Sequence, residues 1–397
     1  MSSIYGLNVP NNWEVVALDQ IKSDEKKALI SGPFGSNISA KYFTPTGVPV
    51  IRGNNLSLDV FTRFKDNGFV FVSPEKADEL GTWAQAEDII FTAVGTLGQI
   101  GLLSHKQNYP RYIISNKQIR LRLNQDKVTP QFAYYWLASD LMQEVIEQRN
   151  TGSSVPLINL GVVKNLLIPL PPLPEQKAIA SVLSSLDDKI DLLHRQNKTL
   201  EAMAETLFRQ WFIEEAKEDW EEVSLGSLFT ISSGKGLKRE QFRDNGLIPV
   251  LGANGVIGRT DQVMFEEFLI YTGRVGTLGK VSIVEGQPVW LSDNTLVFRD
   301  IEYFYFTYFH LKAVNYQDYN VGSTQPLIRQ SDIKEIAVLL PSDLVMIKRF
   351  EFQAKDLFGK IQRNTKQIQT LENLRDTLLP KLMSGEVRVQ YQTETTA

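Results

Sequence analysis

Hydrophobic residues recur with two different periods along this chain of 397 residues, and the two periods alternate. In residues 1–170 and 218–341, short β-branched and aromatic runs such as Asp88-Ile-Ile-Phe-Thr92 and Phe268-Leu-Ile-Tyr271 are separated by Gly, Asn and Pro. Runs of this kind, bounded by turn residues, predict strands. A helical pattern interrupts the first of these segments from Pro130 to Arg149. We therefore expect two β-rich globular domains.

The segments that follow these domains, residues 171–217 and 342–385, carry a sustained period of 3.5 residues. In the first segment, apolar or small residues follow one another at 4-3 spacing: Ile179, Leu183, Leu186, Ile190, Leu193, Leu200, Ala204, Leu207 and Trp211. Adding 171 to these positions gives a matching seam in the second segment, interrupted at Asn364 and Arg375. A 3.5-residue period kept over several heptads predicts an intramolecular coiled coil. Residues 386–397 form a polar C-terminal tail.

Two asparagines at core positions of this seam, Asn197 and Asn364, suggest a register for the helix pair. In an antiparallel pair with two-fold pseudo-symmetry, the two meet if the centre of the first helix is residue 195. The helix expected from Pro174 to Lys217 has almost the same midpoint. A matched pair satisfies its own hydrogen bonds and specifies register. The alternative is that both side chains face solvent or a partner protein.

The chain also repeats itself. Thr151-Gly-Ser-Ser-Val-Pro-Leu-Ile158 reappears as Val321-Gly-Ser-Thr-Gln-Pro-Leu-Ile328, and Val94-Gly-Thr-Leu-Gly98 recurs identically from Val275. Trp13-Glu-Val-Val16 matches the segment that begins at Trp220. The matches keep their order along the chain, which indicates an internal duplication. The expected fold class is α+β, with two related β-rich domains separated by two long helices in an antiparallel coiled coil.

Residue types that carry catalysis are scarce. The chain has no cysteine, and its histidines, His105, His194 and His310, lie too far apart in sequence for metal-ligand spacing. It contains neither a G-x-G-x-x-G nor a G-x-x-x-x-G-K-[ST] motif. We therefore expect a non-catalytic chain without a metal site or a cofactor of its own. No stretch approaches 18 consecutive apolar residues and the first ten residues do not resemble a signal peptide, so we expect a cytoplasmic protein without a membrane span.

The net charge is −4, so any positively charged surface must come from local clusters of Lys and Arg. One basic cluster contains Arg111, Lys117, Arg120 and Arg122, and another surrounds Gly234 and Gly236, whose missing Cβ atoms would allow close approach to a phosphate. Arg and Asn side chains read guanine and adenine edges, whereas Lys anchors phosphates. The candidate DNA contacts are Arg52, Asn54, Arg111, Lys117, Lys235, Lys238, Arg239, Arg259 and Arg274. Of these, Arg52 and Arg274 are the preferred candidates for base reading, although isolated surface cations are ordinary.

Several stretches together resemble the specificity subunit of type I restriction–modification systems. They include Trp13-Glu-Val-Val-Ala-Leu18, the segment from Ser31-Gly-Pro-Phe-Gly-Ser36 to Arg52, and Gly246-Leu-Ile-Pro-Val-Leu251. Leu170-Pro-Pro-Leu-Pro-Glu-Gln176 resembles the start of the first spacer helix, and Leu374-Arg-Asp-Thr-Leu-Leu-Pro-Lys-Leu382 the end of the second. The second helix departs from the pattern, because Leu340-Pro-Ser-Asp343 lacks the Leu-Pro-Glu-Gln sequence.

The resemblance implies two target recognition domains, each reading one half of a bipartite, asymmetric sequence in double-stranded DNA. It also implies that the helices dock two methylation subunits, that restriction subunits join the complex, and that S-adenosylmethionine binds to the methylation subunit. Two alternatives remain open on sequence alone. Metal-dependent turnover by the isolated chain would favour a two-domain, nuclease-like enzyme. Absence of sequence-selective DNA binding, even with methylation subunits present, would favour a scaffold of duplicated interaction domains.

Overall fold

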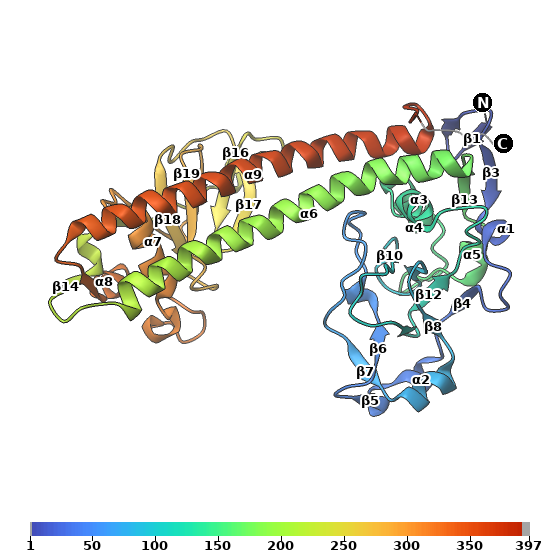
Figure 1. Cartoon of the computed structure of the whole chain (residues 1–397), viewed down its shortest axis with the longest axis horizontal. Coiled ribbons are helices and arrows are strands. Elements are labelled where there is room, and N and C mark those ends of the chain that lie inside the picture. Colours follow the sequence, from blue (N-terminus) through green and yellow to red (C-terminus); the bar gives the residue numbers. More distant parts are fainter. Residues whose placement is uncertain (1, 391–397) are drawn as a thin grey trace. The chain divides into compact units, whose positions relative to one another are not determined.

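The computed structural model describes residues 2–390, and these residues form two compact units (Figure 1). The first unit contains the chain up to Leu192 and again from Gln367, and the second contains Leu193–Lys366. Each unit combines one β-rich domain with portions of two long helices, α6 (Leu173–Arg209) and α9 (Leu344–Ser384). Of the expected tail 386–397, residues 391–397 lie outside the described residues.

The first domain contains two sheets, and the short segment from β11 (Tyr112–Ile114) to β12 (Gln118–Leu121) connects one to the other. The antiparallel sheet has the order β10 (Ile100–Leu102), β9 (Ile89–Thr92), β12 (Gln118–Leu121), β4 (Leu29–Ser31). The second sheet has the order β5 (Phe43–Thr44), β7 (Val70–Val72), β6 (Val48–Ile51), β11 (Tyr112–Ile114), β8 (Trp83–Ala84). Strands β11 and β6 pair in parallel, so their C-terminal ends lie at the same edge.

Short helices and two ribbons complete this domain. The helices are α1 (Leu18–Ile21), α2 (Pro74–Leu80), α3 (Pro130–Leu137), α4 (Asp140–Gln148) and α5 (Leu160–Lys164). The ribbons pair β1 (Ser2–Ile4) with β2 (Leu7–Val9), and β3 (Glu14–Ala17) with β13 (Leu167–Leu170). The single helical stretch expected from Pro130 to Arg149 is thus two helices. The break coincides with Ser139, whose hydroxyl donates a 2.7 Å hydrogen bond to the Trp136 carbonyl.

The second domain repeats this arrangement with fewer strands. Its antiparallel sheet has the order β15 (Thr230–Ser233), β21 (Thr295–Arg299), β18 (Phe268–Gly273), β19 (Ser282–Glu285). A three-stranded sheet joins β17 (Gly255–Thr260), β16 (Ile248–Gly252) and β20 (Trp290–Leu291), and β16 and β20 are parallel, as β6 and β11 are. A ribbon pairs β14 (Glu221–Ser224) with β22 (Ala337–Leu340), and the helices are α7 (Phe304–Ala313) and α8 (Gln330–Lys334). The repeated strand order shows the duplication in three dimensions.

Within the second unit, α6 and α9 pair in the antiparallel sense. Asn364 is buried, and its Nδ2 donates a 2.8 Å hydrogen bond to Oδ1 of Asn197, which is the contact required by the symmetric register. The rings of Trp211 and Phe350, fourteen residues after the first asparagine and fourteen before the second, lie 6.4 Å apart. The two contacts therefore share one antiparallel register.

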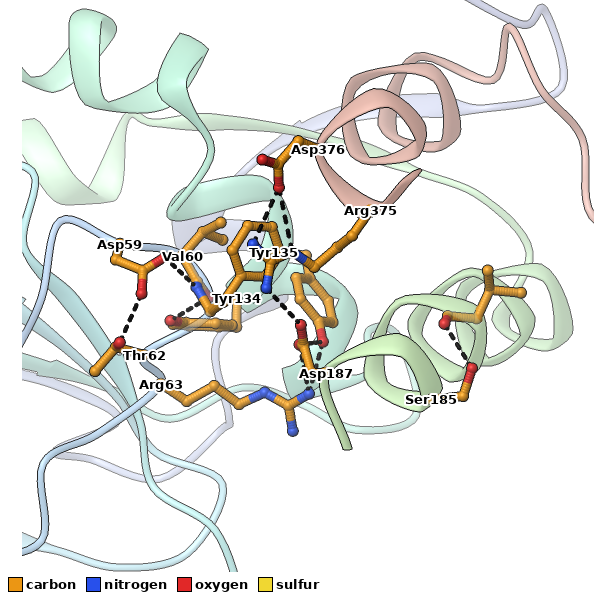
Figure 2. A network of polar contacts seen from close by, with 12 residues as sticks. Asp59, Val60, Thr62, Arg63, Tyr134, Tyr135, Ser185, Asp187, Arg375 and Asp376 are labelled. Carbon is orange, nitrogen blue, oxygen red and sulfur yellow. Dashed lines mark hydrogen bonds and ion pairs between the residues drawn. The ribbon is translucent and has the colours of Figure 1, made fainter. Parts of the chain in front are cut away.

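Within the first unit, the same two helices meet through charged side chains (Figure 2). Asp187 of α6 receives hydrogen bonds from Nη2 of Arg63 (3.0 Å) and from the Tyr135 hydroxyl (2.5 Å), so it links the first domain to the helix. Nη1 of Arg375, on α9, lies 3.5 Å from the same carboxylate. Arg375, which interrupts the apolar seam in the sequence, is 8% exposed and lies over the ring of Phe61. This interruption is therefore a buried ion-pair network.

The Leu-Pro-Glu-Gln start of α6 also has a structural explanation. Glu175 is fully buried and accepts hydrogen bonds from the indole of Trp13 (3.2 Å) and from Nε and Nη2 of Arg388 (2.6 and 2.9 Å). Gln176 accepts from the Thr129 N–H at 2.9 Å. Helix α9 starts differently, with the carboxylate of Asp343 accepting from the Val345 N–H at 2.9 Å.

Among the described helices, none combines the length and apolarity needed to cross a bilayer.

Candidate nucleic-acid interface

A polar cleft of about 770 Å³ lies in the first domain where β6, β9 and β12 meet. Arg52 follows β6 directly, and Gln118 begins β12. The polar residues that line the cleft are Arg52, Asn54, Thr92, Thr96, Gln99, Ser115, Asn116, Lys117 and Gln118. Three of them, Arg52, Asn54 and Lys117, were expected from sequence to contact DNA. The structure therefore brings these three residues, which are up to 65 positions apart in the chain, together in one cleft.

Backbone contacts hold the floor of this cleft. The Ser115 N–H donates to the Ile51 carbonyl at 2.9 Å, which ties the end of β6 to the turn before β12. Gly32 donates to the Gln118 carbonyl at 2.9 Å, and a Cβ at Gly32 would lie 1.8 Å from the Ser115 carbonyl oxygen. Only glycine permits this approach. The buried Asn55 amide donates to the carbonyls of Lys65 (3.0 Å) and Asn67 (2.8 Å), which closes the loop after Arg52.

The basic side chains of the cleft differ in their surroundings. Lys117 is exposed at the cleft, and Nε of Arg52 is buried without a hydrogen-bond partner among the described residues. Asn54 is exposed, and its amide donates weakly to the Gly68 carbonyl at 3.3 Å. Arg111 does not line the cleft. Its guanidinium stacks 4.0 Å from the centroid of the Trp83 ring and stays exposed.

Two members of the first basic cluster have structural roles instead. Nε and Nη2 of Arg122 each bind the carboxylate of Asp88 at 2.8 Å, and Nη1 binds Glu25 at 2.7 Å. Arg120 is 3% exposed, and its guanidinium donates to the Lys27 carbonyl. The Asp88 carboxylate also lies 3.7 Å from Nη1 of Arg120. Charge density along the sequence therefore overstated the number of cations available to DNA, because carboxylates from distant parts of the chain pair with both arginines.

The second domain has an equivalent strand junction with a different arginine. Gly234 donates to the Thr295 carbonyl at 3.1 Å, as Gly32 does to Gln118, and the Ser292 N–H donates to the Leu251 carbonyl at 2.9 Å. Arg52 thus corresponds to Gly252, and the arginine of this junction is Arg274, from the end of β18. Its Nη1 donates to the Ser233 hydroxyl at 3.0 Å, while its Nε is buried without a partner in the described chain. Each domain therefore places one arginine at the junction, but from a different strand.

The glycines of the second basic cluster have a different role from the one expected. A Cβ at Gly234 would lie 2.1 Å from the Ser292 carbonyl oxygen, so the domain's own backbone explains this glycine. At Gly236, a Cβ would lie 3.3 Å from the carboxylate of Asp293, a group that repels phosphate. Contacts within the domain therefore account for both glycines without a bound phosphate. The nearby Lys235, Lys238 and Arg239 are exposed, and Lys238 Nζ lies 3.9 Å from Glu240.

Arg259 lies on β17, where its Nη1 donates to the carbonyls of Gly246 (3.3 Å) and Leu247 (3.4 Å).

The three histidines do not come together in the fold. His105 lies 3.4 Å from Glu87, His194 is exposed on α6, and His310 is buried between the rings of Phe208 and Phe306. Over residues 2–390, no group of three or more His, Asp or Glu side chains could hold a metal ion.

Sequence analysis missed three amide side chains of the cleft, those of Gln99, Asn116 and Gln118. The sequence offered one signal, since Asn116 and Gln118 flank Lys117, which belongs to the first basic cluster. Charge-based reasoning passed over them because an amide adds nothing to the net charge. Burial distinguishes Gln118 in particular, because it is fully buried and its Nε2 has no partner in the part of the chain that is described.

Comparison with known proteins shows what these domains resemble. The family model described as "Type I restriction modification DNA specificity domain" matches residues 10–202 and again 217–369. The MjaIX specificity subunit of a type I restriction enzyme from Methanocaldococcus jannaschii is 29% identical over 76% of this chain and 78% of its own length. The MjaVIII specificity subunit from the same organism is 23% identical over 98% and 96%, respectively. The crystal structure of a type I S subunit from M. genitalium covers 98% of this chain and 99% of its own, with a TM-score of 0.62 and 20% identity.

Proposed function

Since this chain belongs to the type I restriction modification DNA specificity family, we propose that it selects a bipartite, asymmetric DNA target, with one recognition domain for each half-site. The single observation that carries the proposal is the duplication of the domain together with its strand junction. At this junction each copy has an arginine, Arg52 in the first and Arg274 in the second, and the Nε of each is buried without a partner among the described residues, although the two arginines come from different strands. Arginine is the side chain most often used to read base edges.

The division of labour follows from the side chains on each surface. Arg52 and Arg274 are proposed base readers. Exposed cations around them, Lys117 in the first domain and Lys238 in the second, are proposed phosphate contacts. A chain with a net charge of −4 has little long-range attraction for DNA. We therefore propose that methylation subunits, docked on the long helices, supply much of the phosphate contact and carry S-adenosylmethionine, and that restriction subunits join this complex.

Mapping of methylated adenines tests this proposal. The chain is co-expressed with its methylation subunits in cells that lack other adenine methyltransferases, and the modified positions are located in the genomic DNA. We expect a single motif made of two specific segments separated by a spacer of fixed length. Cells with catalytically inactive methylation subunits provide the control. A purified, folded complex that methylates without sequence preference, or not at all, would contradict the proposal.

Phosphate contact is tested separately at Lys238. Lys238→Ala should weaken binding of the complex to specific and non-specific duplexes by a similar factor, and should reduce the slope of log K against log salt by about one. Glu240→Gln, which removes the nearby carboxylate, is the matched control and should not reduce that slope. An unchanged salt slope in Lys238→Ala would show that this lysine does not contact phosphate.

A further inference from the structure

The cleft of the first domain contains two hydrogen-bond donors that no other described residue of the chain uses. Gln118 is fully buried, and its Oε1 accepts a hydrogen bond from the Ser115 hydroxyl. Because that hydroxyl accepts from the Lys117 N–H at 3.4 Å, its own proton is directed to Oε1 of Gln118. The other amide atom of Gln118, Nε2, is therefore a donor without a partner among the described residues. Nε of Arg52 is the second buried donor without a partner in the described residues. Buried donors are almost always satisfied, so two in one cleft indicate a ligand with acceptor atoms.

The chemistry of the cleft selects among the four bases. In the major groove, guanine presents two acceptors, N7 and O6, side by side, whereas adenine and cytosine present an amino donor and thymine presents a methyl group. An amino group of adenine or cytosine facing Arg52 and Gln118 would place a donor of the base against donors of the protein, so no hydrogen bond could form. On the basis of the proposed function, we infer that the first recognition domain reads a guanine, with Arg52 and Gln118 supplying the donors to its N7 and O6.

A phosphate is the other acceptor-rich group of DNA, but the cleft suits it less well. Gln118 is neutral and fully buried, so it offers no charge to compensate an anion. The exposed cation of this cleft is Lys117, and a flexible ammonium group suits a phosphate along the rim. The expected arrangement therefore has Lys117 on the backbone and Arg52 with Gln118 on the base.

The second domain provides an internal contrast. The residue equivalent to Gln118 is Thr295, whose hydroxyl donates to the Ser292 carbonyl at 2.7 Å. Its donor is therefore used within the protein, and the amide of the first domain has no counterpart at that position. Guanines read through the second domain should consequently be indifferent to changes at Arg52 and Gln118, which gives the experiment an internal control.

The experiment uses the complete complex with its methylation subunits and the target found by mapping methylated adenines. Each guanine of both half-sites is replaced singly by 7-deazaguanine, which exchanges the N7 acceptor for a C–H, and dissociation constants are measured. In the native complex, one guanine of one half-site should show a loss of about 10-fold or more. Arg52→Ala should bind the unmodified target about 10-fold more weakly and should no longer distinguish guanine from 7-deazaguanine at that position.

Two further variants separate base reading from charge and folding. Arg52→Lys keeps the charge, so it should bind non-specific DNA like the native complex yet lose discrimination at the same guanine. Lys117→Ala should weaken binding to all duplexes and retain the 7-deazaguanine effect. Gln118→Met, which replaces the amide by an apolar side chain of similar size, should reduce the effect. Thermal unfolding of each variant shows whether the first domain is intact.

The inference is overturned if Arg52→Ala and Arg52→Lys keep full sensitivity to 7-deazaguanine at every guanine. It is also overturned if Arg52→Ala weakens binding uniformly with a reduced salt slope, since Arg52 would then contact phosphate. A native complex that binds specifically to a target in which no guanine is sensitive refutes guanine reading and leaves the proposed function standing. A native complex without sequence-selective binding refutes the proposed function itself.

Discussion

A single hydrogen bond between two amides, Asn364 Nδ2 to Asn197 Oδ1 at 2.8 Å, identifies the register of α6 and α9 in the second unit. Buried polar pairs of this kind lower stability relative to apolar residues but exclude other registers. Asn197 also donates to the Thr365 hydroxyl at 3.4 Å, so its amide has two partners across the helix pair. This asparagine pair therefore decides which of the registers that the apolar seam permits is adopted.

Replacement of one asparagine should cost more than replacement of both. Asn364→Leu leaves the Asn197 amide without its main partner, so the free energy of unfolding should fall by about 1–3 kcal/mol. The double variant Asn197→Leu/Asn364→Leu should recover much of that loss, because no amide remains unsatisfied. Urea denaturation measures both changes, and Lys198→Ala, an exposed neighbour on α6, is the control. Equal, additive losses would contradict the pairing.

A second residue-scale prediction concerns pH. Burial lowers the pKa of His310 to about 4, and its Nε2 has no partner among the described residues. The unfolded chain binds a proton near pH 6.5 whereas the folded chain does not, so stability should fall as the pH drops from about 6.5 to about 4. The expected loss is on the order of 2–3 kcal/mol.

His310→Leu should remove this acid sensitivity. Both proteins retain Glu351, whose pKa burial raises to about 7 and whose contribution to the pH dependence has the opposite sign. The difference between the two stability curves therefore isolates the histidine. Unfolding free energies measured from pH 4 to pH 8 provide the test, and parallel curves for the two proteins would show that His310 does not contribute.

At the scale of elements, equivalent positions hold the two domains on the helices by different means. In the first unit, Tyr135, Asp187 and Arg375 form a charged network. Residues 358 and 204, which correspond to 187 and 375 through the offset of 171, are the buried apolar side chains Phe358 and Ala204 in the second unit. Phe358 packs there against the rings of Tyr308 (5.7 Å) and Phe309 (6.1 Å). At these equivalent positions, the first unit therefore uses ionic contacts and the second uses apolar and aromatic ones.

This difference predicts where a charge change is costly. Asp187→Asn leaves Arg63 and Arg375 without their shared carboxylate, and removal of one partner from a largely buried ion-pair network costs about 3 kcal/mol. Asp188→Asn, at the exposed neighbouring position, should change stability by less than about 0.5 kcal/mol. Hydrogen exchange of α3 and of the α6 portion up to Leu192 should report the loss locally. Similar stability of the two variants would show that the network contributes nothing.

At the scale of the whole molecule, the duplication predicts two separable readers. Replacement of residues 218–341 by the equivalent domain of another specificity subunit should change one half of the methylated motif and leave the other half intact. The reason is that each domain has its own sheets, core and strand junction. Mapping of methylated adenines before and after the exchange is the measurement. Alteration of both halves would show that the domains do not read independently.

The chain by itself determined the features that depend on periodicity and order. The 3.5-residue period located both helices, the internal repeats implied two domains of one topology, and two core asparagines implied their own contact. These features are local or repetitive, so residue spacing alone reports them. The helical pattern expected from Pro130 to Arg149 shows the limit, because Ser139, whose hydroxyl donates to the Trp136 carbonyl, separates α3 from α4 without interrupting the apolar pattern.

Only the tertiary structure decided which charged and polar groups are available for function. Arg122 is neutralised by Asp88, 34 residues away, and Arg375 by Asp187 on the other long helix. Conversely, Gln118 emerged as a candidate because folding buries it in the same cleft as Arg52, where its Nε2 has no partner among the described residues. Pairing and desolvation depend on distances between segments remote in sequence, and they determine whether a charge or a donor remains for a ligand. Spacing along the chain carries no record of those distances.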